Sequence, residues 1–252
     1  MVTHAQPAPA RNGTGQWWPS KYGSGDQAGA LNEITPGKVL EAVRLVRRGR
    51  LYDLAHVLHH LQEGDRTYNG FLLADIIEDH GTNRLGIDTL PQVVTRGLLL
   101  DVAAARGGER LGPGEVITVA DAENALASTG HEVRPGDAVF FHTCWGSLWG
   151  TDNERYAAGE PGPGRALGQW LADHQVALTG CDTWSFGAYP AEDPREPFVV
   201  PQTLNVRYGI VVVENLRLAE IAEAHVHEYL LVISHAKLRG ATGAWVAPLA
   251  II

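Results

Sequence analysis

The sequence predicts one α/β domain built on a mixed β-sheet with flanking helices. Helix-like and strand-like segments follow one another along the whole chain, and neither an internal repeat nor a Ser/Gly-rich linker separates them. The 252 residues suffice to bury a large core, and the 44% hydrophobic and 19% charged residues are typical of a globular protein. We expect a disordered N-terminus over residues 1–15 and a single domain over residues 16–252.

The first predicted helix begins at Pro36, directly after Thr35, which is a typical N-cap residue, and ends before Gly49. Its apolar residues recur at helical spacing: Val39, Leu40, Val43 and Val46. A short helix over residues 71–81 comes next, closed by a glycine. One or two buried strands are expected over residues 92–103, where the sequence is almost continuously apolar.

The second half of the chain mixes helices and strands. Helices are predicted over residues 117–130, with Thr118 or Asp121 as the cap, and over residues 162–175 and 218–224. Strands are predicted over residues 136–143, 176–183, 208–216 and 228–238, each of which is short and rich in Val, Leu, Ile or Phe. This order indicates a mixed sheet.

Composition excludes several classes of function. The formal net charge is −9 and the only basic run, residues 44–50, ends a predicted helix, so we expect no nucleic-acid partner. No apolar run reaches the ~18 residues of a membrane span, so we expect no membrane partner. The N-terminus does not resemble a secretory signal, which predicts a cytoplasmic protein whose two cysteines, Cys144 and Cys181, are free thiols.

Three histidines, His56, His59 and His60, lie within five residues. His56 and His60 are one helical turn apart and could hold a metal ion on one face of a helix. The same segment also fits a strand followed by a turn, and no carboxylate stands at a fixed spacing from these histidines. From the residues alone, an ordinary histidine-rich turn is therefore favoured over a metal site.

Polar residues follow three predicted strands, and strand ends are common places for catalytic groups. His142, Thr143, Cys144 and Trp145 follow the first of these strands, Asp182, Thr183 and Trp184 follow the second, and Glu214 ends the third. A partly buried Glu has a raised pKa, which suits proton transfer, although a loop-anchoring role is equally compatible with the sequence.

Two further residue types leave alternatives open. Cys144 could be a nucleophile or could simply be packed in the protein. Its side chain is expected to touch that of His142 only if the strand continues through Cys144. Five tryptophans could wall a pocket for a flat apolar substrate or could belong to the core: Trp17, Trp18, Trp145, Trp149 and Trp184.

Several stretches together resemble the cyclase family, which includes kynurenine formamidase and isatin hydrolase. They are "WPSKYGSGDQAGALNEITPGKVLEAVRLVRRGRLYDLAHVL", "TLPQVVTRGLLLDVA", "RPGDAVFFHTCW", "VALTGCDT", "GIVVVENLRLAEIA" and "LRGATGAWVAPLAI". The resemblance covers nearly the whole chain, in the order of the family. It implies a swivelling β/β/α domain, a homodimer or homotetramer, and metal-dependent hydrolysis of amide or lactam bonds.

The metal-binding signature of that family, HxGTHxDxxxH, is absent from this sequence. The resemblance makes His60 the counterpart of its last histidine, which acts as the acid and base, whereas the two ligand histidines and the ligand aspartate have no counterparts. Dinuclear relatives carry a His-Gln pair where this chain has Pro201-Gln202. Glu214 is the one remaining carboxylate of that second site, and one carboxylate does not form a metal cage.

The sequence therefore predicts a metal-independent cyclase-family enzyme without a cofactor. His60 and Glu214 would perform acid/base chemistry, such as cyclisation or dehydration, on a small carbonyl-containing metabolite, for example in specialised metabolism. One alternative is a metal-dependent hydrolase after all, and another is a non-catalytic binding or assembly subunit. The predicted substrate-binding residues are Trp18, Tyr68, Asn69, His142, Thr143, Trp145, Asp182 and Trp184.

Overall fold

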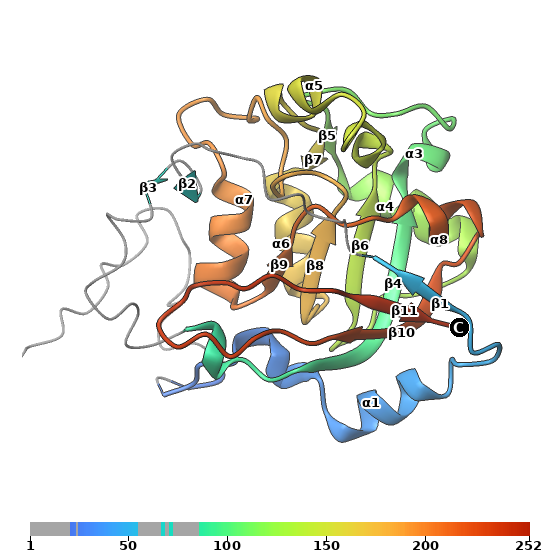
Figure 1. Ribbon diagram of the computed structural model, residues 1–252, viewed down its shortest axis with the longest axis vertical. Helices are drawn as coiled ribbons and strands as arrows, with labels where there is room; N and C mark the ends of the chain where they lie inside the picture. The colour runs from blue at the N-terminus through green and yellow to red at the C-terminus, as the bar shows by residue number, and fades with distance from the viewer. Residues whose placement is uncertain (1–20, 24, 55–66, 69–70, 73–85) are drawn as a thin grey trace, which may run out of the picture.

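A computed structural model describes residues 21–23, 25–54, 67–68, 71–72 and 86–252 (Figure 1). The predicted disordered N-terminus over residues 1–15 lies outside these ranges, as does the histidine cluster. No helix in the described ranges is long and apolar enough to cross a membrane.

The predicted mixed sheet is confirmed. Seven strands are ordered β1-β11-β10-β4-β6-β8-β9, with antiparallel pairing from β1 to β4 and parallel pairing from β4 to β9. The strands are β1 (Leu51–Asp53), β4 (Val93–Asp101), β6 (Ala138–His142), β8 (Leu178–Cys181), β9 (Val211–Val213), β10 (Glu228–Ile233) and β11 (Leu249–Ile251). Two short pairs lie outside the sheet: β2 (Thr67–Tyr68) with β3 (Phe71–Leu72), and β5 (Val116–Ile117) with β7 (Gly162–Pro163).

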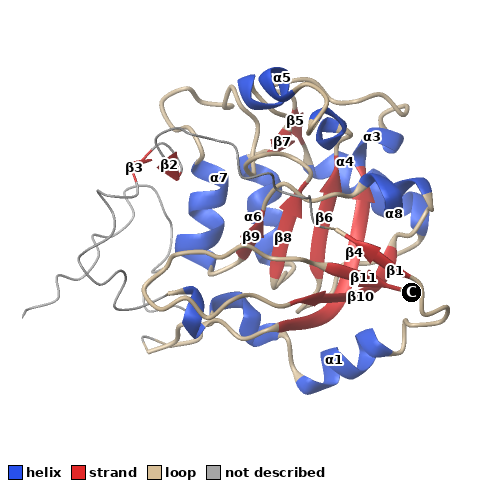
Figure 2. Cartoon of the chain, in the orientation of Figure 1, coloured by secondary structure: helices blue, strands red, loops and turns tan. Residues whose placement is uncertain are grey.

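Helices flank this sheet. The α-helices are α1 (Pro36–Val43), α3 (Val102–Ala105), α4 (Val119–Thr129), α5 (Asn153–Ala158), α6 (Arg165–Asp173), α7 (Val199–Gln202) and α8 (Ala219–Glu223). Shorter or wider turns are η1 (Gly29–Glu33), η2 (Ile87–Thr89), η3 (Trp145–Leu148) and η4 (Thr203–Tyr208), the last of which is a π-helix. Figure 2 shows α3 and α5 beyond the ends of the long central strands.

The core has one part on each face of the sheet. On one face, residues of α4, α6 and η4, such as Ala122, Leu167 and Leu204, pack against the odd-numbered residues Val139 and Phe141 of β6. The other part includes Phe140 of β6 together with residues of η1, α8 and the curled antiparallel strands. Alternation along β6 thus supplies both parts, as expected for a strand covered on both sides.

Helix α1 differs from its prediction. It starts at Pro36 behind the Thr35 cap, as expected, but ends at Val43 rather than at Gly49. Leu40 and Val43 of the predicted apolar face are largely exposed, whereas Lys38 and Ala42 are buried. The predicted buried face was wrong, because the Lys38 side chain points inward and its ammonium pairs with the buried carboxylate of Asp137.

Three other expectations need correction or stay open. Residues 71–72, expected to begin a helix, lie in strand β3, and the remainder of that expected helix, residues 73–81, is not described. Strand β10 ends at Ile233, five residues before the predicted end. The apolar stretch at residues 92–103 forms one strand, β4, and then turns into α3 because Asp101 caps that helix by accepting a hydrogen bond from the N–H of Ala104.

Replacing Thr118 with Ala should lower the free energy of unfolding by about 1 kcal/mol. Thr118 caps α4 by accepting a hydrogen bond from the N–H of Asp121, and the Asp121 carboxylate accepts one from the N–H of Thr118. Urea denaturation of the two proteins would measure the loss. Thr118→Ser is the control, because it keeps the capping hydroxyl, and an equal loss in both variants would contradict the capping role.

Candidate functional site

Polar side chains gather where the parallel strands end, a region that we call the carboxyl edge. Asp101 ends β4 and His142 ends β6, while Asp182 directly follows β8 and Glu214 directly follows β9. Because these four strands are parallel neighbours, their carboxyl ends lie at one edge of the sheet. In open α/β sheets this edge is the usual place for ligand binding.

Glu214 is the titratable group at the β9 end of the carboxyl edge. Its carboxyl group is largely buried, and burial raises its pKa to about 7. The nearby Ser185 side chain lowers the pKa, but not enough to offset the burial. Glu214 can therefore both accept and release a proton near neutral pH, as a general acid/base residue must.

A second carboxyl group, Glu160, lies close enough to Glu214 to interact with it electrostatically. Glu160 is fully buried, and its Oε2 accepts a hydrogen bond from the N–H of Ser185 at 3.0 Å. Burial, together with the negative charges of Glu214 and Asp182, raises the pKa of Glu160 to about 9. At neutral pH Glu160 is thus a protonated, neutral acid beside a carboxyl that titrates.

The sequence did not indicate Glu160. It stands in "AAGEPGPG", a stretch that resembles an exposed loop. In the structure, the backbones of Glu160 and Tyr189 form two hydrogen bonds of 2.8 Å, one in each direction. The Glu160 side chain is buried at this bridge. Gly159 is required beside it, because a Cβ atom there would lie 2.8 Å from the carbonyl oxygen of Tyr189.

The fold brings Asp182 and Thr143 together, and the two predicted substrate-binding residues form hydrogen bonds with each other. Asp182 Oδ1 accepts hydrogen bonds from the N–H and the hydroxyl of Thr143 at 2.9 and 2.6 Å, and Oδ2 accepts one from the N–H of Gly146 at 3.2 Å. Both side chains are buried. Asp182 thus holds the turn that follows β6, and its predicted role in substrate binding stays a prediction.

The predicted aromatic wall is divided between core and site. Trp145 is buried with Leu148 and Tyr156, and its indole N–H donates to the carbonyl oxygen of Tyr156, so it belongs to a small core. Trp184 packs edge-on against the rings of Tyr189 and Phe198, with ring centroids 5.9 Å apart in both pairs. Its indole N–H is buried and has no hydrogen-bond partner among the described residues.

His142, predicted to bind substrate, is nearly buried and lies between two neighbours, Asp101 and Cys144. Tyr68 lies in strand β2. The other predicted site residues, Trp18, His60 and Asn69, fall outside the described ranges. The predicted pairing of His60 with Glu214 therefore stays a prediction.

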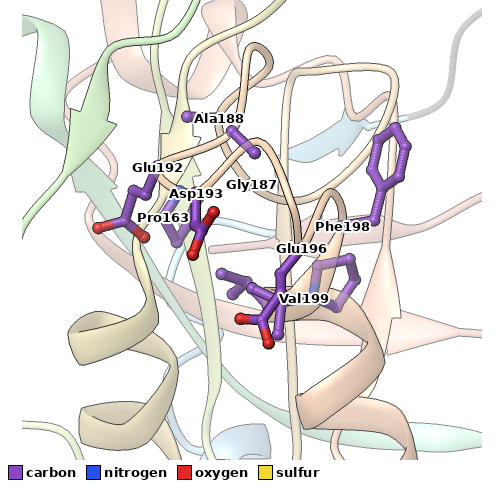
Figure 3. Close-up of a pocket in the computed structure, with 11 residues that line it drawn as sticks. Pro163, Gly187, Ala188, Glu192, Asp193, Glu196, Phe198 and Val199 are labelled. Carbon is purple, nitrogen blue, oxygen red and sulfur yellow. The ribbon is translucent and has the colours of Figure 1, made fainter.

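A surface pocket lies between α7 and the loop over residues 187–196, and its acidic side chains are visible in Figure 3. Glu192 Oε2 accepts a hydrogen bond from the N–H of Arg165, Glu196 pairs with the Arg165 guanidinium, and Asp193 pairs with Arg195. These carboxylates are thus used by the protein itself. Pro201 lines this pocket, whereas Glu160 and Glu214 do not.

The family resemblance implies a divalent metal, which needs several ligand side chains close together. Within the described ranges, no group of three His, Cys, Asp or Glu side chains is arranged to hold a metal ion. The Asp182 oxygens already accept hydrogen bonds from the turn after β6. The described part of the site therefore does not fit a metal cage, and His56, His59 and His60 lie outside it.

Comparison with known families agrees with this fold. The Cyclase family model, described as "Putative cyclase", matches residues 58–188, just over half of the chain. The chain belongs to the cyclase family. A search of curated proteins finds no match to this chain.

Several solved structures share the fold. A crystal structure described as a novel cyclase is 23% identical, with a TM-score of 0.77, and the match covers 92% of this chain and 98% of the other. Isatin hydrolase A from Ralstonia solanacearum is 21% identical, with a TM-score of 0.55, and the match covers 66% and 63% of the two chains. A structure described as a potential metal-dependent hydrolase with cyclase activity is 19% identical, with a TM-score of 0.53 and coverages of 80% and 96%.

Proposed function

We propose that this cyclase-family protein is an enzyme that performs general acid/base chemistry on a small carbonyl compound without a metal ion. Glu214 is the group that moves the proton, and His60 is its partner. A cytoplasmic location, assembly as a homodimer or homotetramer, and a role in specialised metabolism belong to the same proposal. The sequence supports it through the missing HxGTHxD signature.

The observation that carries the proposal is the presence of two buried carboxyl groups, Glu214 and Glu160, that interact electrostatically. Burial raises the pKa of Glu214 to about 7 and that of Glu160 to about 9, and the negative charge of Glu214 adds to the effect of burial on Glu160. Two carboxyl groups held in different protonation states at neutral pH are typical of acid/base sites. Glu214 supplies a base while Glu160 remains a hydrogen-bond donor.

Two buried polar atoms that lack partners among the described residues support the proposal that a small polar ligand binds here. Glu160 Oε1 and the indole N–H of Trp184 have no hydrogen-bond partner in the described part of the chain. Buried polar atoms without partners cost free energy, and a bound molecule can satisfy them. A protonated Glu160 and the Trp184 N–H are donors, so the ligand group that they fit is an acceptor such as a carbonyl oxygen.

The proposed reaction uses these three groups. Glu214 removes a proton from the carbon next to the carbonyl, and hydrogen bonds from Glu160 and Trp184 stabilise the negative charge that develops on the carbonyl oxygen. The resulting carbanion equivalent can close a ring or expel a hydroxyl group. Cyclisation and dehydration therefore share one first step.

Replacing Glu214 with Gln tests this first step directly. NMR in D₂O would follow exchange of the protons next to the carbonyl in a panel of small ketones and β-dicarbonyl compounds, with protein dialysed against a chelator. We expect Glu214→Gln to lower the rate about 10² to 10⁴-fold. For the wild type, the rate should rise with pH through about 7, as the Glu214 base loses its proton.

Glu123→Gln on the exposed surface of α4 is the matched control and should keep the wild-type rate. Exchange that is equally fast in Glu214→Gln and in the wild type would refute the proposal. His60→Ala distinguishes an enzyme from a binding subunit, because loss of exchange supports catalysis. A variant that neither loses exchange nor differs from the wild type in ligand binding would argue against a role for His60.

The second candidate is a metal-dependent amide or lactam hydrolase. It is favoured by the fold neighbours described as isatin hydrolase and metal-dependent hydrolase. The test is metal analysis of the purified protein, together with isatin opening in the presence of Mn²⁺ or Zn²⁺. Stoichiometric metal and ring opening that a chelator abolishes would replace the first proposal with this one.

A further inference from the structure

Cys144 lies in an unusual turn at the carboxyl edge. Strand β6 ends at His142, helix η3 begins at Trp145, and between them Cys144 has a φ of 61°. A positive φ is uncommon for a residue other than glycine and marks a position that its surroundings hold in place. The hydrogen bonds of Asp182 to Thr143 and Gly146, on either side of Cys144, supply that restraint.

This turn brings the thiol onto the imidazole of His142. Cys144 Sγ lies 3.6 Å from His142 Nε2, and His142 Nδ1 lies 3.0 Å from Asp101 Oδ1. The sequence predicted contact only if the strand continued through Cys144. That expectation was wrong, because the left-handed turn makes the contact after the strand has ended.

Asp101 is held by its own contacts in a position that orients the His142 imidazole. It is paired with His142 in the register of the parallel strands β4 and β6. Its Oδ1 also accepts a hydrogen bond from the N–H of Ala104 at the start of α3. A nucleophile, an imidazole and an orienting carboxylate in this order form the arrangement that activates cysteine and serine nucleophiles in unrelated folds.

The charges around His142 favour its protonated form. Burial by itself lowers the pKa of His142, but its interactions with Asp101, Cys144 and Asp182 outweigh burial and raise the pKa to about 10. Burial raises the pKa of Asp101, but the hydrogen bonds from His142 and Ala104 more than offset it and keep that carboxyl ionised. His227, which precedes β10, also lowers the pKa of Asp101 through its charge.

Arg110 is linked to the turn through Ser147. Its guanidinium donates a hydrogen bond to the Ser147 hydroxyl, which in turn donates to the carbonyl oxygen of Cys144. Cys144 is only half-buried. A half-buried thiol in contact with an imidazole is open to reagents and has a general base beside it, as nucleophilic cysteines do.

We propose that Cys144 is a nucleophilic residue that accepts activated acyl groups, with His142 as its general acid and base and Asp101 as the positioning residue. The Sγ–C bond forms as the thiolate attacks the carbonyl carbon, and the bond from that carbon to the leaving group breaks. His142 Nε2 gives its proton to the leaving group. Water, deprotonated by His142, then cleaves the thioester and releases the carboxylic acid.

This inference does not depend on the proposed role of Glu214, because the two groups occupy different strand ends, β6 and β9. The chain also provides an internal control. Its other thiol, Cys181, is fully buried, and burial raises the pKa of Cys181 well above that of an ordinary thiol. Acyl transfer should therefore occur at Cys144 and not at Cys181.

The first experiment uses p-nitrophenyl acetate as the acyl donor. Wild type and Cys181→Ala should release p-nitrophenolate and carry an acetyl group on the Cys144 peptide in a quenched reaction analysed by mass spectrometry. Cys144→Ala, which has no nucleophilic atom at this position, should lose the acetyl group and most of the release. Equal release from Cys144→Ala and the wild type, or an acetyl group on Cys181, would overturn the proposal.

The second experiment separates activation by His142 from a structural role. Iodoacetamide should alkylate the Cys181→Ala protein at pH 6 at least about tenfold faster than the same protein carrying His142→Gln, and the two rates should converge near pH 9, where an ordinary thiol ionises unaided. Asp101→Asn should fall between them. Equal rates at pH 6 would overturn the activation of Cys144 by His142. Both variants should keep the Glu214-dependent proton exchange, because the two sites are separate.

Discussion

Replacing Arg96 with Met is expected to lower the free energy of unfolding by about 3 to 5 kcal/mol. Arg96 lies in β4 with 1% of its surface exposed, and its guanidinium donates to Asp137 Oδ2 at 2.9 Å and to Glu228 Oε1 at 2.6 Å. Asp137 is completely buried, and burial raises its pKa even though Arg96 and Lys38 act against that rise. Without Arg96, a buried carboxylate loses one of its two cationic partners.

Urea denaturation at pH 7 measures this effect. The control is Arg195→Met, which removes a mostly exposed guanidinium that pairs with Asp193, two residues away. It should leave the denaturation midpoint unchanged. Adding Asp137→Asn to Arg96→Met should restore part of the stability, because the uncompensated charge is then gone. A loss in Arg96→Met as small as in the control would show that Asp137 is not ionised in the folded protein.

Replacing Glu160 with Gln should make the stability of the protein less dependent on pH. In the unfolded chain this carboxyl ionises above its ordinary pKa of 4.5, whereas in the folded protein it keeps its proton up to about 9. Its contribution to stability is therefore fully present at low pH and is lost as the pH rises between about 5 and 9. The slope is up to about 1.4 kcal/mol per pH unit.

Gln cannot ionise, so Glu160→Gln should be close to the wild type in stability at pH 5 and more stable at pH 8, by up to about 4 kcal/mol. Thermal or urea denaturation at several pH values gives this difference, in which the contributions of Glu214 and His142 largely cancel. Glu123→Gln should show no such widening with pH. A constant difference between Glu160→Gln and the wild type would mean that Glu160 is already ionised in the folded state.

Local sequence signals predicted the longer helices and the central strands in the described ranges, but not the short helices α3, α5 and α7 or the strand β11. The Thr118 cap, Asp121 and the closing Gly130 mark α4 because they satisfy its terminal backbone groups. Apolar runs predicted β4 and β6, which are buried on both faces. The same approach failed for α1, because its apolar spacing could not show that Lys38 would pair with Asp137, a residue far along the chain.

The sequence by itself determined the α/β class and the family, because both follow from the order of segments along the chain. It also determined the positions of His142, Asp182 and Glu214 at strand ends, which depend on neighbours within a few residues. Only the tertiary structure brought Glu160 beside Glu214 and turned Cys144 onto His142 and Asp101. The pKa of a carboxyl or an imidazole is set by burial and by charges that reach it from other strands. Those neighbours come together only when the parallel strands align, so no local pattern contains them.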